Sequence, residues 1–425
     1  MKKILILILF IAGFIGTIKS EELTSDTLVI AQTEIQAFDA DNAIQEYLNA
    51  MTPEEKEKSD AYFEGGYWLM VVSFILEIIV AWIFLSLGLS KWIKKIASKF
   101  RNINLQNLTY AFMYLLFAYI LSFPLNIYTS FFREHKFDLS NMTFGEWLSE
   151  DLIGLALMII VGSLLLMALY IVIRKVQKSW WIWGSGILTL FLIISIFIGP
   201  VFISPIFNEY KPLEEGEVRD EILSMARANG VPADNVYMFD ASKQSSRISA
   251  NVSGIGSTIR ISLNDNLLNQ CSVEEIKAVM AHELGHYVLN HIYEMIIYFG
   301  LIIFIGFAFI NWLFAKAINK YGSKWGITSI SDIGGLPLFI FLFSFYFFIA
   351  TPVTNNIVRS NEVEADYFGL NTAREPDGFA SVAMKLSTYR KINPGKTEEV
   401  IFFDHPSGNT RVTTAMKWKA ENLKE

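Results

Sequence analysis

Three of the five histidines in this chain lie within ten residues, and two of them belong to a His-Glu-Leu-Gly-His segment at residues 282–286. On a helix, positions i and i+4 lie one turn apart on the same face, so His282 and His286 can present two imidazole nitrogens to one zinc ion. Glu283 follows the first ligand and can act as general base towards a metal-bound water. Two unrelated histidines on a polar helix face are the alternative, but the number of such segments expected by chance is only roughly 0.003 per chain of this composition. The segment therefore predicts a hydrolytic zinc site with one Zn2+ per chain.

A catalytic zinc ion takes three protein ligands and leaves one position open for water. Glu362 is the best candidate for the third ligand, because it lies in an acidic helical stretch just after the last apolar segment. Asp366 follows four residues later on the same helix face and can orient a ligating imidazole through its other ring nitrogen. Glu364 points about 200° around the helix and is the weaker candidate. Without the histidine pair, this stretch would be interpreted as a solvated acidic face.

The histidine pair needs a helix, and the residues before it supply the helix start. Ser272 and Glu275 form an S-x-x-E capping box. Apolar residues then recur at helical spacing at Val273, Ile276, Val279 and Met280. The region that leads to this helix is expected to form a small α/β unit, with a helix over 216–229, a strand near 236–239 and further strands between 253 and 263.

The composition indicates a membrane protein. Of the 425 residues, 52% are hydrophobic and only 18% are charged, whereas a soluble globular protein carries about 25% charged residues. An ordinary soluble enzyme and a disordered or fibrous chain are therefore excluded. The net charge is −7 and no basic cluster has a nucleic-acid pattern, so no nucleic-acid partner is expected. The single cysteine, Cys271, forms neither an internal disulfide nor a CxxC metal site.

Several apolar segments approach the length of about 20 residues that a helix needs to cross a bilayer core. Six long ones lie near residues 67–90, 109–132, 151–173, 181–206, 293–317 and 335–354. A shorter apolar run at 4–16 follows two lysines, which is typical of a signal peptide, but residues 18–20 make a poor cleavage site. A signal peptide and a retained first helix both remain open for residues 1–20. We expect a mainly α, polytopic membrane protein with six or seven transmembrane helices and a small α/β metallopeptidase domain.

Hydropathy and charge together divide the chain into regions. The segment 21–64 carries twelve acidic and two basic residues and is expected outside the bilayer. The predicted regions are residues 1–20, an acidic extramembrane segment at 21–65, a four-helix transmembrane region at 66–207, a metallopeptidase domain at 208–292, two transmembrane helices at 293–354, and catalytic helices at 355–425 that supply the third ligand.

Loop charges predict the orientation in the membrane. The loops at 91–108, 174–180 and 318–334 carry the excess of lysine and arginine and fall on the same side as the N-terminal lysines. Basic loops face the cytoplasm. The two polar regions that carry the zinc ligands, residues 208–292 and 355–425, are therefore predicted on the extracytoplasmic side. With the signal-like start, this predicts an integral protein of a bacterial inner membrane.

The zinc motif is part of a wider resemblance. HELGH followed by a distal R-x-x-E-x-x-A-D at 359–366 resembles the type I CAAX prenyl protease family, which comprises integral-membrane zinc metallopeptidases. Similar elements follow in order over roughly residues 66–425, among them Ser122–Leu125, Arg133–Phe137, Pro205–Phe207, Lys211–Leu213 and His405–Ser407. The resemblance implies a ring of transmembrane helices around an internal chamber that the zinc site faces. Residues 21–60 match the family poorly.

The resemblance also implies a substrate-binding strand, which includes Asn251 and continues through Gly254–Leu263. Ile259 and Ile261 alternate with polar residues there, as expected of an edge strand. An extended peptide could add to such an edge through backbone hydrogen bonds. The interpretation therefore names a peptide or protein substrate.

Other polar residues receive roles from the same resemblance. His405 resembles a family histidine that stabilises the tetrahedral oxyanion, with a loop histidine before a proline as the alternative. Arg359 and Arg411 are expected to support the site, and His291, five residues beyond His286, is interpreted as structural.

The function predicted from these residues is zinc-dependent hydrolysis of peptide bonds by a monomer in the lipid bilayer. The resemblance implies removal of the C-terminal tripeptide from prenylated proteins. A prokaryotic quality-control metalloprotease without prenyl specificity is the nearest alternative. A site-2-type intramembrane protease would place its histidines in an apolar helix and use an aspartate ligand, and a transporter or channel would hold its metal in a closed four-ligand site.

Overall fold

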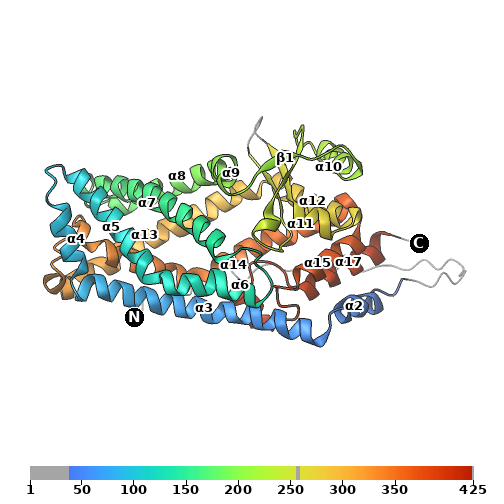
Figure 1. Ribbon diagram of the computed structural model, residues 1–425, viewed down its shortest axis with the longest axis horizontal. Helices are drawn as coiled ribbons and strands as arrows, with labels where there is room; N and C mark the ends of the chain where they lie inside the picture. Colours follow the sequence, from blue (N-terminus) through green and yellow to red (C-terminus); the bar gives the residue numbers. More distant parts are fainter. Residues whose placement is uncertain (1–37, 255–258, 424–425) are drawn as a thin grey trace, which may run out of the picture. The chain divides into compact units, whose positions relative to one another are not determined.

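The computed structural model describes residues 38–254 and 259–423 (Figure 1). In that part of the chain, six helical segments are long and apolar enough to cross a membrane, which confirms the six long apolar segments as helices. They are α3 (Pro53–Ser86), Ile103–Lys136 with α5 (Ile103–Ile127) and α6 (Arg133–Lys136), α7 (Phe144–Lys175), Trp180–Phe207 with α8 (Trp180–Ile198) and α9 (Ser204–Phe207), α13 (His291–Trp325), and Ile333–Ala373 with α14 (Leu336–Ala373). The apolar run at 4–16 lies outside the described residues.

Shorter helices complete the chain. They are α2 (Ala40–Asn49), α4 (Leu89–Ala97), α10 (Glu217–Ala228), α11 (Asp265–Gln270), α12 (Val273–Val288), α15 (Pro376–Leu386), α16 (Lys396–Phe402) and α17 (Gly408–Asn422). Two π-helical turns, Tyr128–Phe132 and Gly199–Ile203, join α5 to α6 and α8 to α9. The helix predicted over 216–229 is confirmed as α10. The capping box predicted before the histidine pair is formed at Ser272.

The long helices pack around an apolar core. Contacts join α5 to α7, α8 to α13, and α13 to both α12 and α14, and Figure 1 shows the blue α3 running beside α14. Phe307 and Phe314 of α13 are almost completely buried in this core, which also contains Trp180 and Leu342. Other large apolar side chains, such as Trp68 with 73% exposure, face outwards. This distribution is the one expected of helices whose outer surface contacts lipid.

Two long helices run past the predicted region boundaries. Thr52 caps α3 with a capping box, and the helix continues without a break from the acidic segment into the apolar one. The division at residue 65 therefore lies inside one helix. The first apolar segment ends earlier than predicted, because Gly88 adopts φ 87° and separates α3 from α4. Likewise α14 continues from its apolar start to Glu362, so the division at 354 also lies inside a helix.

The α/β unit contains a four-stranded sheet. Its strands are β1 (Tyr210–Pro212), β2 (Val236–Phe239), β3 (Ala250–Ser253) and β4 (Arg260–Asn264), in the order β1-β2-β4-β3. Strand β4 pairs parallel to β2 and antiparallel to β3, so β4 is interior and β3 is an edge. The prediction that Ile259 and Ile261 belong to an edge strand is therefore wrong, and Ile261 is completely buried. Alternation of polar and apolar residues does not report strand order, and in β4 the polar Ser262 is as completely buried as Ile261.

Helix α7 links two different environments. Near its start, Glu150 accepts hydrogen bonds from Gln244 of the α/β unit at 2.9 and 3.0 Å. Near its end, Arg174 donates to Asn104 in the first turn of α5 at 2.5 Å. The basic loops meet at this second end, where Lys94 forms a 2.6 Å ion pair with Asp332. The α/β unit and the basic loops therefore lie at opposite ends of α7.

Candidate metal centre

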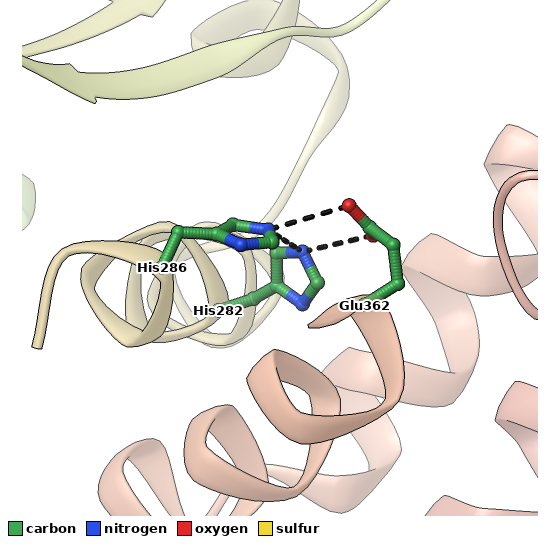
Figure 2. Close-up of side chains that lie close together, drawn as sticks. All are labelled: His282, His286 and Glu362. Carbon is green, nitrogen blue, oxygen red and sulfur yellow. Dashed lines mark hydrogen bonds and ion pairs between the residues drawn. The ribbon is translucent and has the colours of Figure 1, made fainter. Parts of the chain in front are cut away.

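The two motif histidines and the predicted third ligand converge on one point (Figure 2). His282 and His286 project from one face of α12, and Glu362 approaches them from α14. The two Nε2 atoms lie 3.1 Å apart. Each Nε2 lies 3.4 Å from an oxygen of Glu362, Oε2 for His282 and Oε1 for His286.

This arrangement fits a zinc ion. Ligand atoms at 2.0–2.1 Å from a tetrahedral zinc ion lie about 3.3–3.4 Å from one another. The three separations of 3.1, 3.4 and 3.4 Å agree with that spacing. Two imidazoles and one carboxylate form the donor set of a catalytic site, in which the fourth position stays open for water. The residues present therefore fit the metal that the sequence predicts.

Glycines allow the two ligand helices to approach this closely. A Cβ atom on Gly369 of α14 would lie 3.1 Å from the backbone nitrogen of His282. A Cβ atom on Gly285 of α12 would lie 3.0 Å from Cδ1 of Phe368 and 3.3 Å from Cα of Ala365. All three distances are shorter than ordinary van der Waals contact, so a larger residue would push the helices apart. Gly285, the glycine inside the HELGH segment, therefore has a packing role that the zinc-binding function of the segment does not indicate.

Asp366 and Arg411 hold the ligands in place. Oδ1 of Asp366 lies 2.9 Å from Nδ1 of His282. A carboxylate only accepts, so Nδ1 carries the proton and Nε2 keeps its lone pair for a metal. Arg411 of α17 donates through Nε to Asp366 and through Nη2 to Glu362, each at 2.9 Å. A supporting role for both residues is the one expected from the sequence.

The electrostatics of the site favour a cation. Burial opposes a charged imidazole at His282, but hydrogen bonds to Asp366 and Glu362 outweigh burial and raise the pKa of His282 to about 10. The carboxylates therefore stabilise positive charge at the position that a divalent ion would occupy. Burial raises the pKa of the neighbouring Glu283 above its usual range, although the two histidines oppose this. A carboxylate with a raised pKa is better matched to proton transfer near neutral pH.

The site opens into a cavity of about 190 Å³. Helix α15 lines it with apolar side chains, whereas the ligand helices and the loops line it with polar ones. The apolar lining includes Phe379, Val382, Ala383 and Leu386 of α15. The polar lining includes His282, Glu283, Glu362, Asp366, Arg390, His405 and Arg411. No sequence motif marks Arg390.

His405 reaches the ligands from the loop between α16 and α17. Its Nε2 lies 3.4 Å from Oε2 of Glu362, and its Nδ1 lies 2.8 Å from Oδ1 of Asp404. Arg359 was expected to support the site, but it contacts this loop instead. It donates to the backbone oxygens of Glu399 and, at 2.8 Å, of Phe403. Arg359 therefore positions the segment that leads to His405 and does not bind a ligand directly.

His291 is closer to the site than its spacing suggests. Its Nδ1 lies 2.9 Å from Nδ1 of His286, and its side chain is almost completely buried. Five residues along an unbroken helix would point it elsewhere, but Asn290 adopts φ 62° and turns the chain between α12 and α13. The five-residue spacing from His286, which predicts that His291 faces elsewhere, is therefore misleading, and His291 contacts a ligand directly. When Nε2 of His286 binds a metal, its Nδ1–H donates to His291, whose own Nε2 lies 3.5 Å from Glu364.

The edge strand β3 lies beside the site. Asn251 pairs with Ser262 within the sheet, and β3 packs against α12. Ile248, Ser249 and Ala250, at the start of β3, line the same cavity as Glu283. Gly254 follows the strand with φ 96°. The backbone of β3 is therefore the sheet edge that an extended peptide could reach.

Comparisons with known proteins cover nearly the whole described chain. Residues 212–419 match the model of peptidase family M48, and residues 36–209 match a model described as CAAX prenyl protease N-terminal, five membrane helices. The chain is 28% identical over 372 residues to the uncharacterized metalloprotease YhfN of Bacillus subtilis, covering 86% of this chain and 87% of the relative. It is 28% identical over 320 residues to CAAX prenyl protease 1 of Saccharomyces cerevisiae, covering 72% and 70%. The crystal structure of S. mikatae Ste24p superposes with a TM-score of 0.70 at 25% identity, covering 89% of this chain and 94% of that one.

Proposed function

Since the chain belongs to peptidase family M48 and is a membrane metalloendopeptidase, we propose that it hydrolyses peptide bonds with one zinc ion held by His282, His286 and Glu362. The convergence of the three ligand atoms at 3.1–3.4 Å beside Glu283 carries this proposal. The family assignment argues against the transporter or channel alternative. A glutamate rather than an aspartate in the third position argues against a site-2-type protease.

The residues around the metal suit hydrolysis of an amide. When bound, zinc acts as a Lewis acid and lowers the pKa of its water to about 7. Glu283 accepts the proton of the attacking water and delivers it to the leaving nitrogen. Asp366 keeps the imidazole of His282 in the tautomer that binds metal. In its protonated form, His405 keeps Asp404 on Nδ1 and presents Nε2–H to the developing oxyanion.

The substrate is proposed to bind as an extended strand. The backbone of β3 around Asn251 offers an edge to which a peptide could add through main-chain hydrogen bonds. Such pairing selects the shape of the peptide more than its sequence. Gly254 follows β3 with φ 96°, a left-handed conformation that favours glycine. Ile261 is left out of this proposal because β4 is interior, and Ile259 is left out because it precedes β4 and belongs to no strand.

Two substrate classes are proposed for this site. Several relatives are named CAAX prenyl proteases, which favours removal of a C-terminal tripeptide from prenylated proteins. The metalloprotease of B. subtilis, which aligns over more of the chain, is not named a prenyl protease, so a quality-control protease that acts on unprenylated proteins is the second proposed class. Hydrolysis of a farnesylated peptide and its unprenylated counterpart, measured side by side, separates the two. Cleavage of the farnesylated peptide alone supports CAAX processing, and equal cleavage supports the second class.

The roles of the site residues are tested by Glu283→Gln. This variant should bind one zinc ion per chain and lose hydrolysis of model peptides, because the amide cannot accept the proton. Glu274→Gln is the matched control, since Glu274 is exposed on the same helix and should leave the rate unchanged. Wild-type rates in the zinc-loaded Glu283→Gln variant would refute the assignment.

The site is proposed to face the extracytoplasmic side of a bacterial inner membrane. The basic loops and the α/β unit lie at opposite ends of α7, and basic loops face the cytoplasm. A reporter fused after Glu425 should be active only outside the cytoplasm. Cytoplasmic activity of that reporter would reverse the orientation without affecting the catalytic proposal.

A further inference from the structure

The cavity of the metal centre contains two arginines in different states. Arg411 is buried and is neutralised by ion pairs with Glu362 and Asp366. Arg390, in the segment between α15 and α16, lines the same cavity. Within residues 38–254 and 259–423, the guanidinium of Arg390 forms no hydrogen bond or ion pair. The cavity therefore holds one guanidinium whose donors are free.

The environment of Arg390 is unfavourable for an isolated charge. Burial and the nearby positive charge of Arg411 both lower the pKa of Arg390. The charges of Asp404 and Glu362 also reach Arg390, but Asp404 contacts His405 and Glu362 is shared by Arg411 and the histidines. A guanidinium with free donors in a cavity wall is suited to bind an anionic group that enters the cavity.

A peptide bound near its end supplies such an anion. Every unmodified C-terminus carries a carboxylate, and the planar guanidinium matches a carboxylate with two parallel hydrogen bonds. Three residues of extended chain span about 10 Å, so a carboxylate can lie in the same cavity as a scissile bond a few residues before it. The apolar wall formed by Phe379, Val382 and Leu386 can receive the side chains between them.

We propose that Arg390 binds the free C-terminal carboxylate of the substrate and so selects scissile bonds that lie a few residues from the end of a chain. This inference rests on the proposed peptidase function and adds the group that the site recognises. Arg390 is thus a specificity-determining residue, whereas Arg411 is a positioning residue for Glu362. This recognition does not depend on prenylation, because it concerns the free carboxylate at the end of the released peptide that lies away from the scissile bond.

Binding tests this proposal without turnover. In zinc-loaded Glu283→Gln protein, a tripeptide with a free carboxylate should bind at least ten-fold more tightly than the same tripeptide with a C-terminal amide. Adding Arg390→Gln should abolish this preference, because it should weaken the binding of the tripeptide acid and leave the binding of the amide unchanged. Lys396→Gln is the matched control, because it removes an exposed positive charge at the first residue of α16, just after the segment that carries Arg390, and should keep the preference. Arg390→Lys should retain part of it. The proposal would be overturned if the tripeptide acid and the tripeptide amide bound equally to the Glu283→Gln protein with Arg390 intact. An unchanged preference for the acid after Arg390→Gln would also overturn it.

Turnover separates this proposal from the proposed function. With Glu283 and Arg390 intact, peptides that end in a carboxylate should be cleaved with a higher kcat/KM than their amides, and Arg390→Gln should lower only the former. Equal rates for both peptides would refute the role of Arg390 and leave the peptidase function standing. Acid-selective binding without any hydrolysis would refute the peptidase function and leave the carboxylate site. Zinc content and thermal unfolding of each variant show whether it has folded.

Discussion

The two halves of α14 contribute to the protein in different ways. In the half before residue 355, Phe339 and Leu342 are buried among apolar side chains of the other long helices, including Phe307. In the second half, Glu362 and Asp366 are buried as well, but each carboxylate is held by specific donors. One continuous helix therefore joins a core held by dispersion to a site held by directed polar contacts.

This difference indicates which half of α14 should tolerate substitutions better. Apolar contacts are numerous and individually weak, so a substitution of similar size replaces most of what it removes. A buried carboxylate has no substitute partner, so removal of one group leaves another charge unpaired. We therefore expect tolerance to fall sharply between the first and second halves of α14.

The largest expected effect is that of Glu362→Ala. Removing the third ligand should abolish stoichiometric zinc binding and lower kcat/KM by about 10³-fold or more, because the Lewis acid is lost. Zinc content and peptide hydrolysis of the purified protein measure both effects. Ser360→Ala, an exposed position two residues away on the same helix, is the control and should retain both properties. A full zinc content in Glu362→Ala would show that the ligand lies elsewhere.

The next largest effect is expected from Arg411→Met. This change keeps the size of the side chain but leaves the carboxylates of Glu362 and Asp366 buried without their donor. Breaking a buried ion pair on one side costs about 3–5 kcal/mol, so the thermal unfolding midpoint in detergent should fall markedly. An unchanged unfolding midpoint would mean that the contacts of Arg411 do not stabilise the packing of α17 against α14.

A smaller effect is expected from Gly369→Ala in the second half of α14. The added methyl group would meet the backbone of His282 and shift one ligand helix against the other. A displacement of about 1 Å in a catalytic geometry can cost about 10²-fold, so kcat should fall by about ten-fold to a hundred-fold while the protein stays folded. Gly186→Ala in α8 is the control, since its methyl group would enter open space. Equal rates for the two variants would contradict the close-approach argument.

The smallest effect is expected from Phe341→Leu in the first half of α14. Phe341 stacks with Phe74 of α3 and is partly exposed. A leucine keeps most of the apolar contact, so the free energy of unfolding should change by less than about 1.5 kcal/mol. Zinc content and hydrolysis should not change. A loss of zinc in this variant would show that the two halves of α14 are not independent.

The sequence predicted the features that depend on local pattern. The six long helices follow from runs of apolar residues, and α12 follows from a capping box and helical spacing. His282, His286 and Glu362 come together as predicted because each pair or motif occupies one helix face. Hydropathy did not show the helix boundaries, since α3 and α14 continue through changes in polarity.

The remaining features depend on tertiary contacts. The edge position of β3 follows from strand order, which the alternation in a five-residue strand does not encode. The contact between His291 and His286 depends on the single left-handed residue Asn290. Arg359 could equally have reached the ligands or the loop before His405. Arg390 stands out only when the cavity and the pairing of Arg411 are known.

X-ray absorption at the zinc edge, recorded on the purified protein and on His286→Ala, tests the central claim most directly. The account predicts one zinc ion per chain, with two nitrogen ligands from imidazole and oxygen ligands at 2.0–2.2 Å. It also predicts that His286→Ala loses the ion or one of these imidazole ligands. A zinc shell without imidazole, or a spectrum unchanged by His286→Ala, would contradict it.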